Sequence, residues 1–213
     1  MRRRTHSLRA LAAILTLALG TTPLFAGVWT EVGDAGEVPT TAQETLGVGL
    51  LGSIFGTLVP GTPDDVDMYG IFISDPDAFS AIANPDGTHL LMSGGFELND
   101  ATLFVFDSAG YQVASDDDDG ELLLPAIYPG ELAGNSPGYY FISFSLFETL
   151  PTADPITGWS RNPATLQTGP YQIDLTGALP SNIPEPATLL LLASGVLGLV
   201  PCVRRRAKRL DRE

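Results

Sequence analysis

Short apolar runs separated by turn residues are the feature that most restricts how this chain can fold. The turn clusters are Pro60-Gly61, Asp75-Pro76, Pro85-Asp86-Gly87, Ser108-Ala109-Gly110, Pro129-Gly130 and Pro137-Gly138. These residues favour turns because Gly allows a positive φ, Pro restricts φ and Asp bonds to nearby backbone. Between the two chain ends, no apolar period of 3.6 residues is long enough for a major helix. The pattern predicts an all-β fold, an antiparallel β-sandwich of the jelly-roll or immunoglobulin-like type.

The expected strands follow the apolar runs between these turns. They cover residues 52–59, 68–74, 89–93, 102–107, 111–114, 139–146 and 171–176. Tyr171, Ile173 and Leu175 alternate with polar residues, which predicts one buried face and one wet face. Residues 103–106 are apolar at every position, so their strand is expected at the centre of a sheet. The side chains expected to point inward from the 139–146 strand are Tyr140, Ile142, Phe144 and Leu146.

The charge of the chain is divided very unevenly along its 213 residues. From Gly27 to Ile183 there are 22 acidic residues and one base, Arg161, which is a net charge of −21. The remaining Lys and Arg residues lie at the two chain ends. Such a surface repels phosphate, so nucleic acid is excluded as a partner. The single Cys, Cys202, excludes an intrachain disulfide framework.

The N-terminus has the three parts of a secretory signal peptide. Arginines 2–4 are followed by a mainly apolar stretch over residues 8–19 and by small residues that end at Ala26. We therefore expect a signal peptide over residues 1–26, cut between Ala26 and Gly27 by signal peptidase after export by the secretion machinery. An uncleaved membrane anchor is the alternative, although the apolar core is short for a span.

The C-terminus carries a second hydrophobic segment. Residues 187–203 contain no charge and would form about 25 Å of helix, just enough to cross a bilayer. The basic tail, residues 204–213, would stay in the cytoplasm, as would the arginines at the N-terminus. Both ends therefore predict that the segment between them lies outside the inner membrane.

The order of Pro184-Glu185-Pro186, a short hydrophobic helix and Arg204-Arg205-Arg206 resembles the PEP-CTERM sorting signal of Gram-negative bacteria. The resemblance implies that this tail first anchors the chain in the inner membrane. It also implies that an exosortase removes the tail and sorts the protein to the cell envelope or the exopolysaccharide matrix. An ordinary tail anchor after a proline-rich linker is the alternative.

A second resemblance covers residues 45–177 and is carried by residues 65–73, 79–81, 103–110, 116–119 and 137–142. These segments look like the bacterial pre-peptidase C-terminal type of β-sandwich. In that family the domain is a non-catalytic accessory module that sometimes binds calcium and sometimes adheres to a substrate. The present chain has no recognisable peptidase attached to the domain.

The segment between the ends offers few groups for catalysis. It has no Cys, no Lys and one His, His89, and it lacks the His-Glu-x-x-His pattern. We therefore expect a protein that is not an enzyme. A hydrolase that uses His89 or a carboxylate pair is the least favoured alternative.

Acidic clusters are the one local pattern with a binding chemistry. Asp65 with Asp67, and the run Asp116, Asp117, Asp118 and Asp119, could supply the oxygen ligands that Ca²⁺ prefers. A solvated acidic surface is the alternative. Trp159, on the loop from Glu148 to Gly169, is the candidate ligand platform, or else it caps the sandwich while Arg161 pairs with a nearby acid.

The expected organisation is a signal peptide (1–26), an acidic, loosely ordered lead-in (27–44) and a β-sandwich (45–178). A linker with the Pro-Glu-Pro motif (179–186), a transmembrane helix (187–203) and the basic tail (204–213) follow. The favoured function is that of an exported structural or interaction protein at the envelope or in the exopolysaccharide matrix. A carbohydrate- or protein-binding adhesin module is the alternative.

Overall fold

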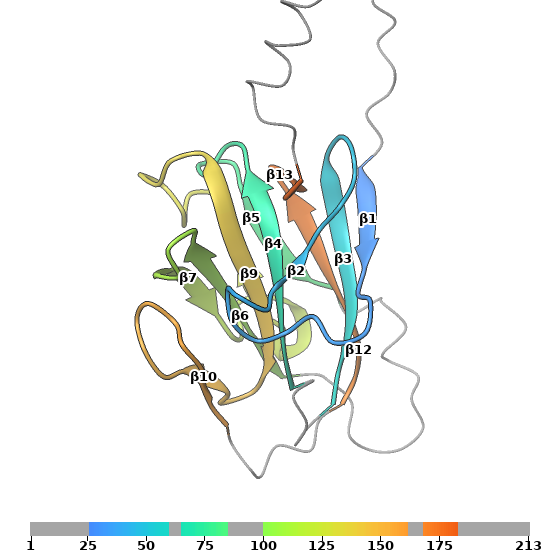
Figure 1. Ribbon diagram of the computed structural model, residues 1–213, viewed down its shortest axis with the longest axis vertical. Coiled ribbons are helices and arrows are strands. Elements are labelled where there is room, and N and C mark those ends of the chain that lie inside the picture. The colour runs from blue at the N-terminus through green and yellow to red at the C-terminus, as the bar shows by residue number, and fades with distance from the viewer. Residues whose placement is uncertain (1–25, 60–64, 85–99, 162–167, 183–213) are drawn as a thin grey trace, which may run out of the picture.

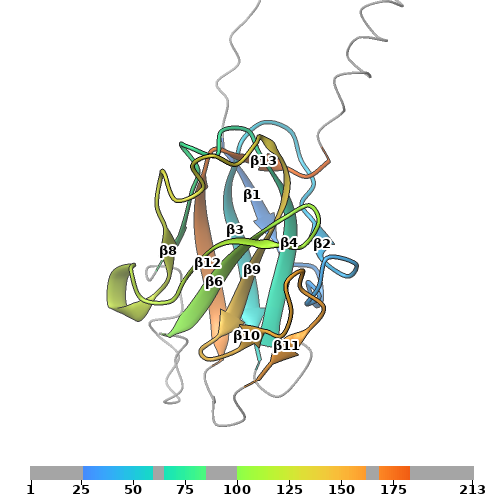
Figure 2. The same ribbon diagram turned by 90° about the vertical axis from the view of Figure 1, so that its left-hand side faces the viewer.

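Two β-sheets pack face to face, as Figure 1 and Figure 2 show from perpendicular directions. The computed structural model describes residues 26–59, 65–84, 100–161 and 168–182. In spatial order, the first sheet contains β1 (Gly27–Thr30), β3 (Leu51–Leu58), β12 (Gly169–Thr176), β5 (Ser80–Ala83) and β8 (Ala126–Ile127).

The second sheet runs in a different strand order. It contains β13 (Ala178–Pro180), β4 (Val66–Ile73), β9 (Gly138–Leu146), β6 (Ala101–Asp107) and β7 (Gln112–Asp116), and β2 (Gln43–Glu44) also pairs with β4. A separate hairpin of β10 (Leu150–Pro151) and β11 (Trp159–Ser160) follows β9, and a 3₁₀ turn, η3 (Glu121–Leu123), precedes β8. The prediction of an all-β sandwich is confirmed.

The main core lies between the sheets and contains the residues that the alternation indicated. The inward side chains Tyr140, Ile142, Phe144 and Leu146 all belong to it, together with Tyr171, Ile173 and Leu175 of β12. Strand β6 lies between β9 and β7, and it is buried on both faces as predicted. Leu103 and Val105 face the main core, whereas Phe104 and Phe106 face a second apolar cluster.

This second cluster covers the outer face of the second sheet. It is formed by Val66, Met68, Phe104, Phe106, Phe141, Ile156 and Trp159. Ile156 and Trp159 come from the hairpin region after β9, so this region packs down onto the sheet. The hairpin region therefore covers one part of the outer face of the second sheet, and the other part is the sheet edge at β7.

The expectation of purely antiparallel sheets is wrong. Strand β1 pairs with β3 in parallel, and β2 pairs with β4 in parallel. The reason is the long connection from Glu31 to Leu50, which crosses to the second sheet as β2 and returns. A connection of this length can bring the chain back in the same direction, which a tight hairpin cannot do.

The 27–44 segment is a part of the sandwich, contrary to the expected loose lead-in. Its backbone forms β1 and β2, and Trp29 Nε1 donates to Gln43 Oε1 at 3.0 Å. Strand β13 likewise extends the domain into the segment expected to be a linker. The pairing of these short strands with β3 and β4 supplies hydrogen bonds that their composition did not indicate.

Several expectations concern residues that the structure does not describe. The expected strand 89–93, the signal helix and the expected span 187–203 lie outside the described residues. Among the described residues, no helix has the length and apolar character needed to cross a bilayer.

Candidate functional site

A groove runs between strand β7 and the β10–β11 hairpin on the outer face of the second sheet. It consists of two hollows of about 560 and 390 Å³ that share Phe104, Ser115 and Leu150 in their walls. These volumes are typical of sites for small ligands. The groove is therefore the candidate binding site on the described part of the chain.

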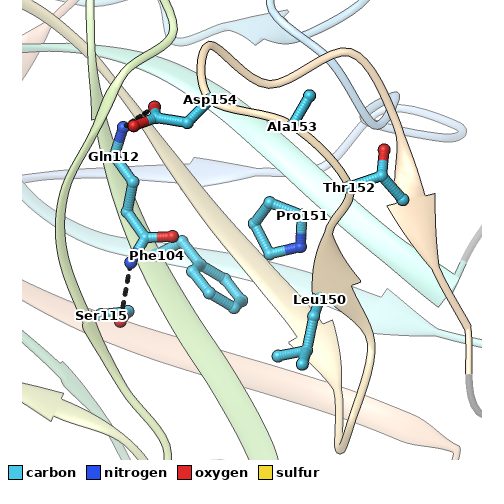
Figure 3. A pocket seen from close by; sticks show the side chains of 8 residues that line it. All are labelled: Phe104, Gln112, Ser115, Leu150, Pro151, Thr152, Ala153 and Asp154. Atoms are coloured by element: carbon cyan, nitrogen blue, oxygen red, sulfur yellow. Dashed lines mark hydrogen bonds between the residues drawn. The ribbon is translucent and has the colours of Figure 1, made fainter.

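Three elements supply the groove walls, as Figure 3 shows for the larger hollow. Phe104 rises from β6, Gln112 and Ser115 project from β7, and residues 150–154 form the facing wall. Gln112 Nε2 donates to Ser115 Oγ at 3.0 Å, which joins the two side chains along one rim. The backbone N–H of Gln112 donates to Asp154 Oδ1 at 3.1 Å and so ties the hairpin to β7.

The smaller hollow ends in a group of carboxylates. Its lining includes Asp116, Asp117 and Glu148, and ligand oxygens of Asp116, Asp117 and Asp118 lie within 4.8 Å of one another. Asp116 Oδ2 accepts hydrogen bonds from the backbone N–H groups of Asp119, at 3.0 Å, and Ala126, at 2.8 Å. The last interaction holds the acidic turn against the start of β8.

These negative charges repel one another. Burial raises the pKa of Asp100, and the charges of Asp117, Asp118 and Glu148 raise it further. The neighbouring charge of Asp116 is the main cause of a raised pKa at Asp119. Each raised pKa means that the folded state holds the proton more readily than the unfolded chain does.

We expect relief of this repulsion to raise the melting temperature as the pH falls from 7 toward about 4, the ordinary carboxyl range. A group whose pKa is raised by folding stabilises the fold once it is protonated, and Asp100 and Asp119 are such groups. Asp174 acts in the opposite direction, because its burial, which raises the pKa, is outweighed by hydrogen bonds from Gln172, Asn84 and Ser53, which lower it. Thermal melts across this range measure the effect. The double variant Asp117→Asn with Asp118→Asn should show a shallower rise, and an unchanged slope would contradict this explanation.

The two acidic clusters, Asp65 with Asp67 and the Asp116–Asp119 run, do not come together in the fold. In the register of the second sheet, Asp67 pairs with Phe144, Phe144 with Leu103, and Leu103 with Asp116. Three strand spacings, about 14 Å, therefore separate the two aspartate backbones along one row. Such a distance is too long for the two groups to share one calcium ion.

Asp65 has an internal cation instead. The residue is 3% exposed, and its carboxylate accepts from Arg161 Nε, at 2.9 Å to Oδ1 and 2.7 Å to Oδ2. Arg161 Nη2 also bonds to Glu37. The single base between Gly27 and Ile183 is therefore held by two carboxylates, which confirms the expected pairing of Arg161 with a nearby acid.

Asp67 belongs to a polar cluster inside the main core. It is fully buried and accepts a hydrogen bond of 2.5 Å from Tyr171 Oη, which lies 2.7 Å from Tyr69 Oη. Tyr69 is on β4 and Tyr171 on β12, so the cluster links the two sheets. Gly56 on β3 makes room for it, since a Cβ there would lie 2.3 Å from Tyr171 Oη and 2.7 Å from Tyr69 Oη.

Trp159 does not present a ligand platform. Its side chain packs edge-on against Phe104 and Phe106, and the residue is 7% exposed. Its Nε1 donates to the Glu37 carbonyl oxygen at 2.6 Å. The expected alternative, a tryptophan that caps the sandwich, describes its position better. The Glu148–Gly169 loop does contribute to the groove, but through residues 150–154.

The sorting residues Pro184, Glu185, Pro186, Arg204, Arg205 and Arg206 lie outside the described residues. A family described as PEP-CTERM protein-sorting motif matches residues 182–206. Residues 182–206 are a PEP-CTERM sorting motif. This finding supports export and sorting by an exosortase to the cell surface. No curated protein and no solved structure matches the chain, so the resemblance to pre-peptidase C-terminal domains is not confirmed.

The PEP-CTERM motif begins where the chain is still bound to the domain. Ser181 N–H donates to the Thr45 carbonyl oxygen at 3.0 Å, and Asn182 Oδ1 accepts from the Gly47 N–H at 3.0 Å. Only Ile183 separates this attachment from Pro184. The folded sandwich therefore extends almost to the residues that an exosortase would recognise.

The predicted mature N-terminus also coincides with a folded element. Gly27 is the first residue of β1, and its N–H donates to the Leu50 carbonyl oxygen at 2.6 Å. A signal peptidase that cuts between Ala26 and Gly27 would thus release a chain that begins directly with a paired strand.

Proposed function

We propose that this chain is a non-catalytic structural or interaction protein that an exosortase sorts to the cell envelope or exopolysaccharide matrix of a Gram-negative bacterium. The PEP-CTERM motif at residues 182–206 is the observation that carries the proposal. In this proposal the secretion machinery exports the chain, signal peptidase removes residues 1–26, and residues 187–203 hold it in the inner membrane until processing.

The residues that line the groove support a role without catalysis. Its lining consists of Thr, Ser, Gln, Ala, Pro, Leu and Phe side chains with Asp and Glu, and no His, Lys, Arg or Cys among the described residues contributes to either hollow. General acid–base work near neutral pH ordinarily uses His, Lys or a carboxyl group made less acidic by burial. The Asp and Glu residues that line the groove are largely exposed.

The sorting step predicts a defined change of mass. In cells with an exosortase, intact-mass analysis of the envelope or secreted fraction should find a species that lacks everything from near Pro184 onward. The Glu185→Ala variant should retain the tail because the recognised motif is altered. A tail retained in both proteins would leave a plain membrane anchor, and equal processing of both would make Glu185 irrelevant.

A second candidate function, calcium binding, is supported by the Asp116–Asp118 group. Its oxygens are of the type that Ca²⁺ prefers, and bound cation would relieve the repulsion among them. Asp65 and Asp67 are not part of this proposal, because Arg161 and Tyr171 occupy their carboxylates.

Saturating calcium is expected to raise the melting temperature by a few degrees. At 100 times the dissociation constant a ligand adds about 2.7 kcal/mol to stability. Melts with chelator, Mg²⁺ and Ca²⁺ at equal ionic strength measure the shift. Asp117→Asn with Asp118→Asn should abolish it, whereas Asp75→Asn with Asp77→Asn, on an exposed turn, should not. Equal shifts with Ca²⁺ and Mg²⁺ would indicate a solvated acidic surface.

A further inference from the structure

The groove lies on the outer face of the second sheet and extends toward the end of the sandwich that is remote from the sorting tail. In Figure 1 and Figure 2, β13 and the start of β1 are at the upper end, whereas β10 is at the lower end. Asn182 is attached to Gly47 at the upper end, and five residues later the expected span begins. Five residues reach at most about 17 Å. An anchored chain would therefore direct the groove away from the membrane.

The groove has both surfaces that an extended polar ligand requires. Its accessible apolar surface comes from Leu150, which is 50% exposed, and from Pro151, beside the buried ring of Phe104. Gln112 and Ser115 on one rim and Thr152 on the other carry amide and hydroxyl groups. The two hollows meet at Ser115, so a single ligand could lie along both.

The charged residues of the groove favour a positively charged ligand. Asp154 lies in the larger hollow, and Asp116, Asp117 and Glu148 lie in the smaller one. Arg161, the single base between Gly27 and Ile183, is held by Asp65 and Glu37. Carboxylates at both ends of an open groove complement a ligand with repeated positive charges.

We propose that the groove between β7 and the β10–β11 hairpin binds a cationic amino-sugar chain, a glycan with free protonated amines. The sugar faces would rest on Leu150 and Pro151 while hydroxyl groups bond to Gln112, Ser115 and Thr152. The amines would pair with the carboxylates at both ends. The inference deepens the proposed surface function, on which it rests, by giving the interaction a chemical class of partner.

The backbone at the groove favours a glycan over a basic peptide. A peptide that binds along a strand obtains much of its affinity from main-chain hydrogen bonds at a sheet edge. At this edge the Gln112 N–H is already bonded to Asp154. The groove therefore offers side-chain groups, which suit sugar hydroxyls, at the point where a peptide would need backbone groups.

The test uses the full chain in nonionic detergent with chelator present, at about pH 6, where free amines carry a proton. Titration calorimetry compares a fully deacetylated glucosamine hexamer with the N-acetylated hexamer, which has no charge. We expect the deacetylated hexamer to bind and the acetylated one to bind at least about tenfold more weakly. Equal affinity for the two hexamers would overturn the charge argument.

Two variants test whether the deacetylated hexamer binds in the groove. Asp117→Asn with Glu148→Gln should weaken binding about fivefold, since each exposed ion pair contributes modestly. Ser115→Trp, which leaves the charge unchanged, should abolish binding by filling the junction of the hollows. The matched control Asp75→Asn with Asp77→Asn removes the same charge from the opposite end and should bind normally.

Other results would overturn the proposal. A loss as large in the control as in the groove variant would indicate unspecific attraction to an acidic surface, and tighter binding of a lysine hexamer would indicate a peptide partner. Failure of glycan binding in a chain that is still cleaved near Pro184 would reject this inference alone. Absence of the cleavage would reject the proposed sorting instead.

Discussion

Replacement of Arg161 by Met is expected to lower the free energy of unfolding by about 3 kcal/mol. Asp65 would remain as a buried carboxylate without its bidentate partner, and removal of one partner of a buried pair ordinarily costs about 3–5 kcal/mol. The lower end applies because the Arg161 side chain is 37% exposed, so water can reach part of the site. For a domain of this size the melting temperature should fall by about 6–12 °C.

Matched variants separate the effect of the Arg161 charge from the effect of its hydrogen-bond geometry. Arg161→Lys keeps the charge but loses the fork that reaches both Asp65 oxygens and Glu37, so its stability should be intermediate. Asp65→Asn combined with Arg161→Met should recover part of the loss, because no buried charge remains at this pair. Thermal and urea unfolding measure all three proteins. An Arg161→Met protein as stable as the original would show that Asp65 is readily hydrated.

The Gly56→Ala variant should also lose about 3 kcal/mol of stability, by a different mechanism. The added methyl would lie 2.3 Å from Tyr171 Oη and 2.4 Å from Tyr171 Cζ, closer than carbon atoms tolerate. The Tyr171 ring cannot move freely, because it packs against Phe144 at a centroid distance of 4.4 Å and its hydroxyl group donates to Asp67. Overpacking costs about 1–3 kcal/mol, and a weakened hydrogen bond to a charged group adds about 1.5–3 kcal/mol.

The chain contains a suitable control for this substitution. At Gly138, the first residue of β9, the nearest atom to an added methyl would be 4.0 Å away, so Gly138→Ala should change stability little. Tyr171→Phe isolates the hydroxyl and should cost about 1.5–3 kcal/mol. Urea unfolding of the three variants makes the comparison. If Gly56→Ala and Gly138→Ala were equally stable, the tyrosine pair would not be tightly constrained.

Asp65 and Asp67 are buried carboxylates, and each has a partner from a distant part of the chain. Arg161 and Asp65 are 96 residues apart, and Tyr171 and Asp67 are 104 residues apart. The family resemblance led us to expect a calcium site at these two aspartates. They bond to other parts of the domain instead, so the proposed interactions rest on the Asp116–Asp118 turn and the groove beside it.

The sequence alone determined the all-β architecture, the inward faces of β9 and β12 and the sorting motif. These properties are local: alternation within one strand decides which side chains share a face, and a linear motif is read in its order along the chain. Only the tertiary structure decided which carboxylates meet, that Trp159 is buried and that the groove exists. Strand register and the crossing of β1 and β2 between sheets control those contacts, because they bring together side chains that no local pattern connects.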